Sequence, residues 1–190
     1  MKLYVIRHGE TEANLNRRYL GHGDSPLTAR GVDQAKRVAN RLGCMGITAI
    51  YSSDLPRAMT SASFLSETLD IPIITDRRLR EVDFGLLDSL TYAEAMHAHR
   101  AAVERWYADW EHNAPPGGEN LHALSLRVHA FLSMLGSTKH EVVALYTHGG
   151  VCDLLLSDAL ARPFVPAVAK PGGYLELLLL PTPQGWRLSS

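Results

Sequence analysis

Short apolar runs alternate along the chain with stretches whose apolar residues recur at helical spacing. The apolar runs predict strands at residues 2–6, 47–51, 71–74, 142–147 and 174–180, with a shorter closing strand at 186–188. The helical spacing predicts helices at 28–42, 91–110, 119–135 and 150–160, and one more after the second strand. Strands that alternate with helices in this way are typical of an α/β fold.

Polar and small residues predict where two of these helices begin and end. Thr28 can cap the helix at 28–42, and Gly43 can end it. Pro56 is tolerated in the first turn of the helix that follows residues 47–51, with Ser53 or Asp54 as its cap. The apolar stripe of this second helix is formed by Ala58, Ala62, Leu65 and Leu69.

Two proline-containing segments bear on the domain organisation. The strand at 71–74 is predicted at an edge of the sheet, because Pro72 cannot donate a hydrogen bond to a neighbouring strand. The segment "APPGG" at 114–118 is a loop, and it separates helices rather than domains. We therefore expect one domain over residues 1–190.

Composition and charge exclude several classes of protein. The chain has 190 residues, 46% of them hydrophobic, which is enough for one sizeable core. A formal net charge of −1 predicts no general attraction to nucleic acid or to an anionic membrane. No apolar run is long enough to span a membrane or to form a signal peptide at the N-terminus. Cys44 and Cys152 lie far apart, so we expect no disulfide framework and a reducing, cytoplasmic location.

Cationic residues follow three of the predicted strands. Arg7 and His8 end the first strand, Arg57 follows the second within the first turn of a helix, and His148 ends the strand at 142–147. Because ligands of open α/β sheets bind beyond the carboxyl ends of the strands, we expect these four side chains to face one crevice. Arginine pairs readily with phosphate oxygens, so the set favours a phosphate ligand.

A phosphate beside an imidazole suggests covalent catalysis. One histidine can attack phosphorus and form a phosphohistidine, while the arginines and a protonated His148 stabilise the equatorial oxygens. The leaving alkoxide needs a proton, which Glu81 or Asp83 in "LREVDFG" at 79–85 could give. Desolvation, or the charge of the bound phosphate, would have to keep that acid protonated.

Each of these residues could instead have a purely structural role. A single histidine such as His8 is more often a core residue, Arg57 could be a surface arginine, and Glu81 could simply pair with an arginine. The other seven histidines show no metal-ligand spacing, so we expect no metal site. Cys152 is expected to be a buried, inert thiol.

The motifs together resemble the histidine phosphatase, or phosphoglycerate mutase-like, superfamily. The resemblance covers residues 2 to about 160, through "RHGET" at 7–11 with Asn14, "GHGDSPLTARGVDQA" at 21–35, "YSSDLPRAMTSA" at 51–62, "LREVDFG" at 79–85, "PPGGEN" at 115–120 and "THGG" at 147–150. It implies a mainly parallel sheet of about six strands flanked by helices, with residues 82–118 forming a small helical cap.

The resemblance also implies roles for individual residues. His8 would be the phospho-acceptor and Glu81 the proton donor, without metal or other cofactor. The phosphate pocket would be formed by Arg7, Arg57, His148, Asn14 and the Gly149 amide, with Gly21 near the substrate.

Within the superfamily the choice lies between a phosphatase and a phosphoglycerate-type mutase. A mutase must shield its phosphoenzyme from water, and only 66 residues lie between Glu81 and His148 to build a closed site. The compact chain is more similar to alpha-ribazole phosphatases and small broad-specificity phosphatases. We therefore expect a phosphomonoesterase that acts on a small phosphorylated metabolite. A non-catalytic phospho-ligand binding module is the third reading, although the nucleophile and the acid are both present.

Several features leave the substrate and the assembly open. Ser89 stands where the family often has glycine, and Asp153 stands where a basic or neutral residue is common. Trp106, Tyr107 and Trp110 form a helical stripe that could pack the cap on the body or line a substrate wall. The segment at 171–180 could be an edge strand that pairs with a second copy in a homodimer.

Overall fold

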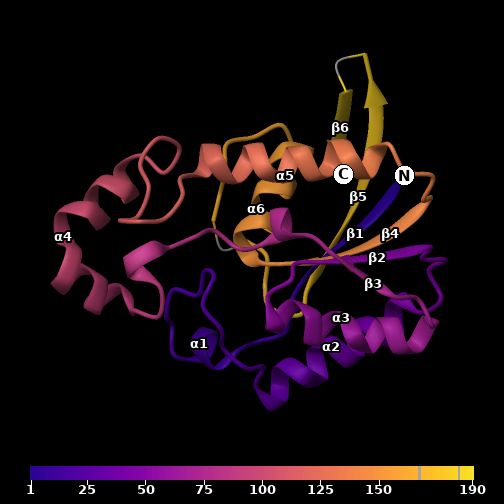
Figure 1. Ribbon diagram of the computed structural model, residues 1–190, viewed down its shortest axis with the longest axis horizontal. Coiled ribbons are helices and arrows are strands. Elements are labelled where there is room, and N and C mark those ends of the chain that lie inside the picture. The colour runs from indigo at the N-terminus through magenta and orange to yellow at the C-terminus, as the bar shows by residue number, and fades with distance from the viewer. Residues whose placement is uncertain (167, 184) are drawn as a thin grey trace.

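A computed structural model describes residues 1–166, 168–183 and 185–190. Its described residues form one six-stranded sheet, in the order β3-β2-β4-β1-β5-β6 (Figure 1). The strands are β1 (Lys2–Arg7), β2 (Ala49–Ser52), β3 (Ile73–Thr75), β4 (Val142–Thr147), β5 (Tyr174–Thr182) and β6 (Gly185–Ser189). The helices are α1 (Glu12–Leu15), α2 (Ala29–Leu42), α3 (Pro56–Leu69), α4 (Tyr92–Ala108), α5 (Leu121–Gly136) and α6 (Gly149–Ala159). Two short 3₁₀ helices, η1 and η2, lie at Arg77–Leu79 and Gly85–Leu87.

The sheet is mixed, so the expectation of a mainly parallel sheet was only partly right. The pairs β3–β2, β2–β4 and β4–β1 are parallel, whereas β5 and β6 are added antiparallel. The parallel strands are joined by helical crossovers, and β6 follows β5 through a short connection. The α/β class predicted from the sequence is confirmed.

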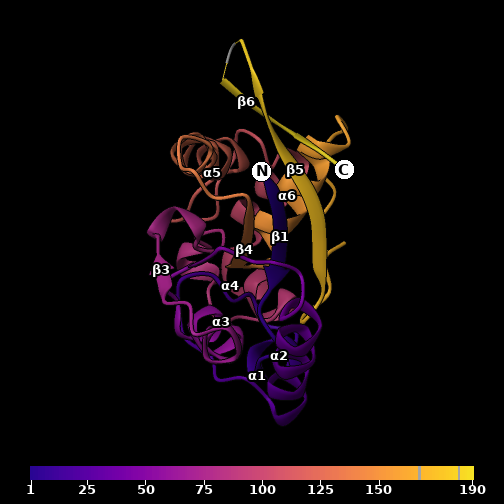
Figure 2. The ribbon, with the colours of Figure 1, turned by 90° about the vertical axis from the view of Figure 1, so that its right-hand side faces the viewer.

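Helices cover both faces of the sheet, with α5 and α6 on one side and α2 and α3 on the other (Figures 1 and 2). Alternate residues of β1 enter opposite layers: Leu3 and Val5 pack toward α5 and α6, and Tyr4 and Ile6 toward α2 and α3. Because both faces of β1 are buried, its sequence reads as an unbroken apolar run.

Residues 82–118 contain η2 and α4, which extend beyond the end of the sheet (Figure 1). A small apolar cluster of Leu87, Ala95, Val103 and Trp106 holds this segment together. The helix predicted at 91–110 spans Tyr92–Ala108, and the backbone is non-helical at His99. Trp106 is buried within the segment, and its ring contacts Tyr19 of the body.

The predicted capping of α3 was wrong. Its N-cap is Leu55, which offers no side-chain hydrogen bond, although Pro56 does occupy the first turn. Asp54 instead forms a two-point ion pair with Arg80, and Ser53 Oγ lies 2.8 Å from His148 Nε2. By contrast, Thr28 caps α2 as predicted, with its side chain accepting from the Gly31 N–H.

The prediction that residues 171–180 form an edge strand was also wrong. β5 pairs with β1 on one side and β6 on the other, so the edges of the described sheet are β3 and β6. The edge position predicted for 71–74 is confirmed for β3.

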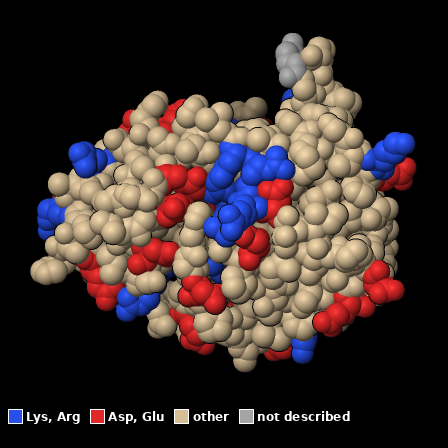
Figure 3. Space-filling view, in the orientation of Figure 1, with Lys and Arg blue, Asp and Glu red and all other residues tan. Residues whose placement is uncertain are grey.

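Charged groups on the face shown in Figure 3 are mixed in sign. A compact group of basic side chains near its centre borders acidic ones. Arg78 pairs with Asp76, and Arg80 with Asp54, both at 2.6 Å. Within the described ranges, no helix is both long and apolar enough to cross a membrane.

Candidate active site

The two predicted histidines meet at the carboxyl ends of neighbouring strands. β1 and β4 run parallel with Arg7 opposite Thr147, so the residues that follow, His8 and His148, emerge side by side. Their ring centroids are 5.1 Å apart at an angle of 61°. Both side chains are buried, and the His8 N–H donates to the carbonyl of Thr147 at 3.0 Å.

Hydrogen bonding defines which nitrogen of His8 is reactive. Nδ1 lies 2.7 Å from the Gly9 carbonyl oxygen, and because a carbonyl only accepts, Nδ1 carries the proton. Nε2 therefore keeps its lone pair, and Arg57 Nε donates to it at 3.3 Å. Gly9 allows the tight exit from β1, since a Cβ there would lie 2.2 Å from the Gly31 carbonyl oxygen.

His148 is oriented by Ser53, one of the two residues that were expected to cap α3. Its Nε2 lies 2.8 Å from Ser53 Oγ, while Nδ1 is buried with no hydrogen-bond partner among the described residues. Burial, and then the charge of Arg57, lower the pKa of His148 well below its ordinary value. The expected protonated form is thus disfavoured here, and a bound phosphate dianion would act in the opposite direction.

The pKa of His8 is also held well below its ordinary value, first by burial and then by the charges of Arg57 and Arg7. A neutral imidazole with a free Nε2 is the form that can attack an electrophile. The local electrostatics therefore favour the nucleophilic form of His8 across the neutral pH range.

Arg57 is fixed by backbone carbonyls on the loop that precedes α2. Nη2 donates to Gly21 at 2.6 Å, and Nη1 donates to Gly23 at 2.9 Å. Gly21 was expected near the substrate, but it does not line the pocket, and its carbonyl anchors Arg57 instead. Burial lowers the pKa of Arg57, although such a group stays charged at neutral pH.

Arg7 approaches the site beside the first turn of α6. Its Nη1 donates to the Ala169 carbonyl at 2.6 Å, and its Nε is buried without a hydrogen-bond partner in the part of the chain that is described. A Cβ at Gly149 would lie 3.0 Å from Arg7 Cζ, so the glycine gives the guanidinium room. A buried, unpaired N–H next to a helix N-terminus suits an anionic ligand.

Glu81 lies at the same helix N-terminus. The Gly150 N–H donates to its Oε1 at 3.0 Å, and the Val82 N–H donates to the same atom at 2.9 Å. Asp83, the alternative acid, does not line the pocket; it accepts from the Gly85 N–H and lies 3.6 Å from His22 Nδ1. Of these two acids, the one that faces the pocket is Glu81.

Asn14 reaches the site from α1. Its amide oxygen accepts from the Thr11 N–H at 3.2 Å, in a capping box that was not recognised in the sequence. The side-chain NH₂ is thereby left to donate to a ligand, and Asn14 lines the pocket.

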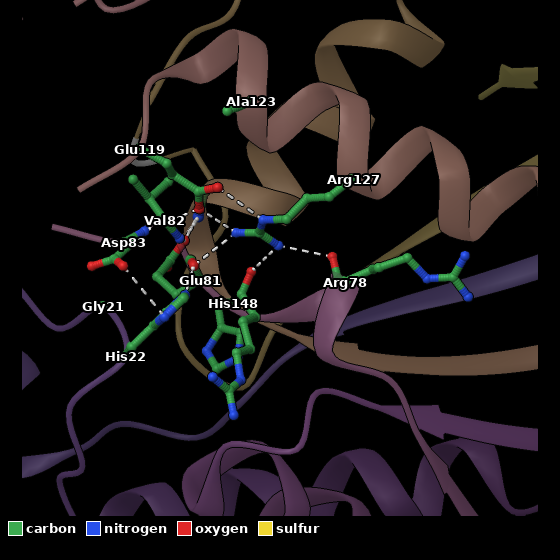
Figure 4. A network of polar contacts seen from close by, with 12 residues as sticks. Gly21, His22, Arg78, Glu81, Val82, Asp83, Glu119, Ala123, Arg127 and His148 are labelled. Atoms are coloured by element: carbon green, nitrogen blue, oxygen red, sulfur yellow. Dashed lines mark hydrogen bonds and ion pairs between the residues drawn. The ribbon is translucent and has the colours of Figure 1, made fainter. Parts of the chain in front are cut away.

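A positioning arginine, Arg127 of α5, was missed by the sequence analysis. Its guanidinium donates to the carbonyls of Arg78 and Glu81, both at 2.8 Å (Figure 4). It also donates to the carbonyl of Arg80 at 2.7 Å. Glu119 accepts from Arg127 Nε at 3.0 Å and from the Asp83 N–H at 3.0 Å. The pair therefore fixes the backbone on both sides of Glu81.

The pocket above these groups has a volume of about 430 Å³. Of the predicted site residues, Arg7, His8, Asn14, Glu81 and Gly149 line it. Arg57 and His148 are almost wholly buried and do not line it, although both contact residues at its base.

Aromatic residues form the outer part of the pocket. Trp106, Tyr107 and Trp110 line it, and Trp106 also packs within the cap, although Trp110 lies beyond the end of α4. Ser89 keeps the left-handed backbone, with φ 68°, that a glycine would adopt there. Asp153 is buried, lines the pocket and accepts from the Ala169 N–H at 2.8 Å.

A metal-binding cluster and the Cys152 thiol are two further groups that could supply chemistry. In the portion of the chain that is described, no three His, Cys, Asp or Glu side chains gather as a metal-binding set. Cys152 is buried, and burial raises its thiol pKa far above the ordinary value, which agrees with an inert thiol.

Comparisons with known proteins agree with this geometry. The sequence model of the histidine phosphatase superfamily (branch 1) matches residues 3–169. An adenosylcobalamin/alpha-ribazole phosphatase of Escherichia coli (strain K12) is 32% identical over 164 residues, which cover 86% of this chain and 81% of that protein. A probable phosphoglycerate mutase, GpmB, of Proteus mirabilis (strain HI4320) is 39% identical over 168 residues, with 86% and 76% covered.

A solved structure extends the likeness to the fold. The alpha-ribazole phosphatase from Shigella flexneri superposes with a TM-score of 0.86 at 28% sequence identity. The superposition covers 99% of this chain and 94% of that one.

Proposed function

Because this chain belongs to the histidine phosphatase superfamily (branch 1), and is thus an enzyme of the phosphatase or mutase kind, we propose that it is a metal-independent phosphomonoesterase. Its substrate is a small phosphorylated metabolite, and the reaction passes through a phosphohistidine at His8. The observation that carries the proposal is the Nδ1 contact of His8 with the Gly9 carbonyl, because it leaves Nε2 as a nucleophile at the floor of the pocket.

The cationic groups around His8 support the choice of phosphate. Arg7 and Arg57 flank the ring, and the Gly149 N–H lies at the start of α6. These donors, with Asn14, stabilise the equatorial oxygens as charge redistributes in the transition state. His148 becomes charged when the phosphate binds and adds a further donor.

The chemical step needs one nucleophile and one acid. The Nε2 lone pair of His8 forms a bond to phosphorus while the ester P–O bond breaks, and Glu81 protonates the leaving oxygen. Glu81 then takes a proton from water, which attacks the phosphohistidine and releases phosphate and neutral His8. Burial of Glu81 against the helix and its position in the pocket support its assignment as that acid.

A phosphoglycerate-type mutase is the second candidate, favoured by the 39% identity to the probable mutase of Proteus mirabilis. Such an enzyme would need a phosphodonor to prime its histidine and would release little phosphate to water. The same phosphohistidine would form, so the two candidates differ in what accepts the phosphoryl group.

The first test is phosphate release from a generic aryl phosphate in excess EDTA. The native chain should turn over with EDTA present, and His8→Ala should lose at least about 1,000-fold in kcat. His122→Ala removes an exposed histidine of α5 and serves as the matched control.

Each other outcome selects a different mechanism. Turnover that EDTA abolishes, or that survives in His8→Ala, would contradict the metal-free phosphohistidine route. Native protein that transfers phosphate between metabolites after priming, but releases none to water, would establish the mutase.

A further inference from the structure

The pocket is apolar beyond its phosphate-binding floor. Its outer wall carries six aromatic side chains, Tyr19, Phe84, Trp106, Tyr107, Trp110 and Phe164. At about 430 Å³, the whole pocket is large enough for a leaving group the size of a fused ring system. A small polar metabolite would leave most of that wall in contact with water.

The wall is built from three separate parts of the chain and is held by ring contacts. Tyr19 comes from the body loop, Trp110 follows the cap helix α4, and Phe164 follows α6. The centroids of Trp110 and Phe164 lie 6.0 Å apart, and those of Tyr19 and Phe84 lie 5.3 Å apart. The Tyr19 and Tyr107 hydroxyls are 2.7 Å apart, which ties the body to the cap. Preformed aromatic walls of this kind favour flat apolar ligands.

The charged groups along the wall are already paired. Arg18 donates to Glu94 and to the Ser89 carbonyl, both at 2.7 Å. Glu119 is bound by Arg127, and Asp153 accepts from the Ala169 N–H. An anionic group on the leaving group would therefore meet carboxylates along the wall. Its nearest unsatisfied donors would be those at the phosphate-binding floor.

From these features we propose that the enzyme selects phosphomonoesters whose leaving group is an uncharged aromatic ring system. The inference rests on the phosphomonoesterase activity proposed above and names the substrate class of the same site. The rings stack against Trp110 and Phe164 while the phosphate contacts His8. Esters with a second anionic group, such as phosphoglycerates, are poor substrates because the cation that the described residues place on the outer wall, Arg18, is already paired with Glu94.

The test uses three esters that share a primary alkoxide leaving group, so that chemical reactivity is matched. They are ethyl phosphate, 2-(1-naphthyl)ethyl phosphate and a carboxylated derivative of the naphthyl ester. We expect kcat/KM to be about 100-fold higher for the naphthyl ester than for the ethyl ester, since ring burial stabilises the bound state. The carboxylated ester should fall at least about tenfold below the naphthyl ester, because its charge would be buried without a partner.

Variants connect that preference to the wall. Trp110→Ala and Phe164→Ala should each reduce the naphthyl-to-ethyl ratio of kcat/KM by about tenfold. Leu126→Ala removes an exposed apolar side chain of α5 that does not line the pocket, and it should keep the native ratio. A ratio that both aromatic variants leave unchanged would overturn the inference.

The native chain separates this inference from the activity on which it rests. Equal kcat/KM for the ethyl and naphthyl esters, or a preference for the carboxylated ester, would overturn the substrate class and leave the phosphatase proposal standing. If phosphate is released neither from any of the three esters nor from an aryl phosphate, both proposals are overturned.

Discussion

The backbone N–H of Gly150 donates to Oε1 of Glu81 at 3.0 Å, so the proposed acid lies against the first turn of α6. The same turn carries the Gly149 N–H that is proposed to hold the phosphate. The acid and the anion are therefore positioned by one helix N-terminus, whose dipole favours negative charge.

Substitution of Gly150 should uncouple acid catalysis from phosphate binding. A Cβ at this position would lie 2.5 Å from Glu81 Oε1, so Gly150→Ala must displace the carboxylate. We expect kcat to fall at least about tenfold, with a small change in the inhibition constant of inorganic phosphate. Steady-state kinetics with phosphate as a competitive inhibitor measure both quantities.

The control for this variant is Gly43→Ala. Gly43 is the C-cap of α2 with φ −59°, and its added Cβ would first meet a Thr68 methyl group at 3.2 Å. Its kcat should match that of the native chain. A Gly150→Ala variant with native kcat would show that the present position of Glu81 is not needed for the reaction.

The buried histidine pair predicts how stability depends on pH. The pKa values of His8 and His148 are lowered by burial and by the nearby arginines, so the unfolded chain binds protons that the folded chain does not. Stability from this source is fully present above the ordinary value of 6.5 and is lost as the pH falls below it. The loss is at most about 1.4 kcal/mol per pH unit for each histidine.

Urea unfolding between pH 7.5 and about 5 measures this dependence. The free energy of unfolding of His148→Gln should fall less steeply with decreasing pH than that of the native chain, because one of the two buried imidazoles is absent. His122→Gln, which removes an exposed histidine, should keep the native slope. Equal slopes for the native chain and His148→Gln would contradict the lowered pKa.

Arg127 should affect both the fold and the reaction. It donates to three backbone carbonyls around Glu81 and pairs with Glu119, with 19% and 16% of the two side chains exposed. Arg127→Met removes one donor from each of these carbonyls and leaves the Asp83 N–H as a donor to Glu119. We expect a loss of about 3 kcal/mol in the free energy of unfolding. The value of kcat should fall about tenfold in conditions where the variant is folded.

The matched control is Arg100→Met on α4, which breaks an exposed pair with Glu104. Such pairs contribute little, so neither stability nor kcat should change appreciably. If folded Arg127→Met keeps the native kcat, Arg127 does not position Glu81 for the reaction, whatever effect the substitution has on stability.

The sequence predicted the residues at the centre of the site better than the residues that position them. Arg7, His8 and His148 could be placed because parallel strands end at one edge of a sheet, so residues that follow β1 and β4 must be neighbours. Arg127 lies 46 residues from Glu81 and bonds to backbone atoms, which leave no pattern in the side-chain sequence. The packing of α5 against η1 brings them together.

Local sequence preferences gave wrong predictions where tertiary contacts decided the structure. Ser53 and Asp54 both have good capping chemistry, yet one contacts His148 and the other pairs with Arg80. The segment at 171–180 was expected to be an edge strand that pairs with a second copy, but β6 pairs along β5 and removes the edge. For Ser53 and Asp54 a partner distant in sequence decided the outcome, whereas the edge at β5 is covered by the next strand of the chain.

Asp153 is proposed to position Arg7 through the chain after α6. Asp153 Oδ1 accepts from the Ala169 N–H at 2.8 Å, and the Ala169 carbonyl accepts from Arg7 Nη1 at 2.6 Å. Asp153→Ala removes the anchor of Ala169, so Arg7 should lose its fixed orientation. We expect kcat/KM to fall about tenfold, and the inhibition constant of inorganic phosphate to rise by a similar factor.

Asp153→Asn separates positioning from charge, because the amide keeps an oxygen that can accept from Ala169. It should recover most of the phosphate affinity that Asp153→Ala loses, while Asp33→Ala at an exposed site of α2 should resemble the native chain. If Asp153→Asn instead binds phosphate as weakly as Asp153→Ala, the negative charge of Asp153 matters more than its contact with Ala169. If both variants bind phosphate as the native chain does, Arg7 does not depend on this anchor.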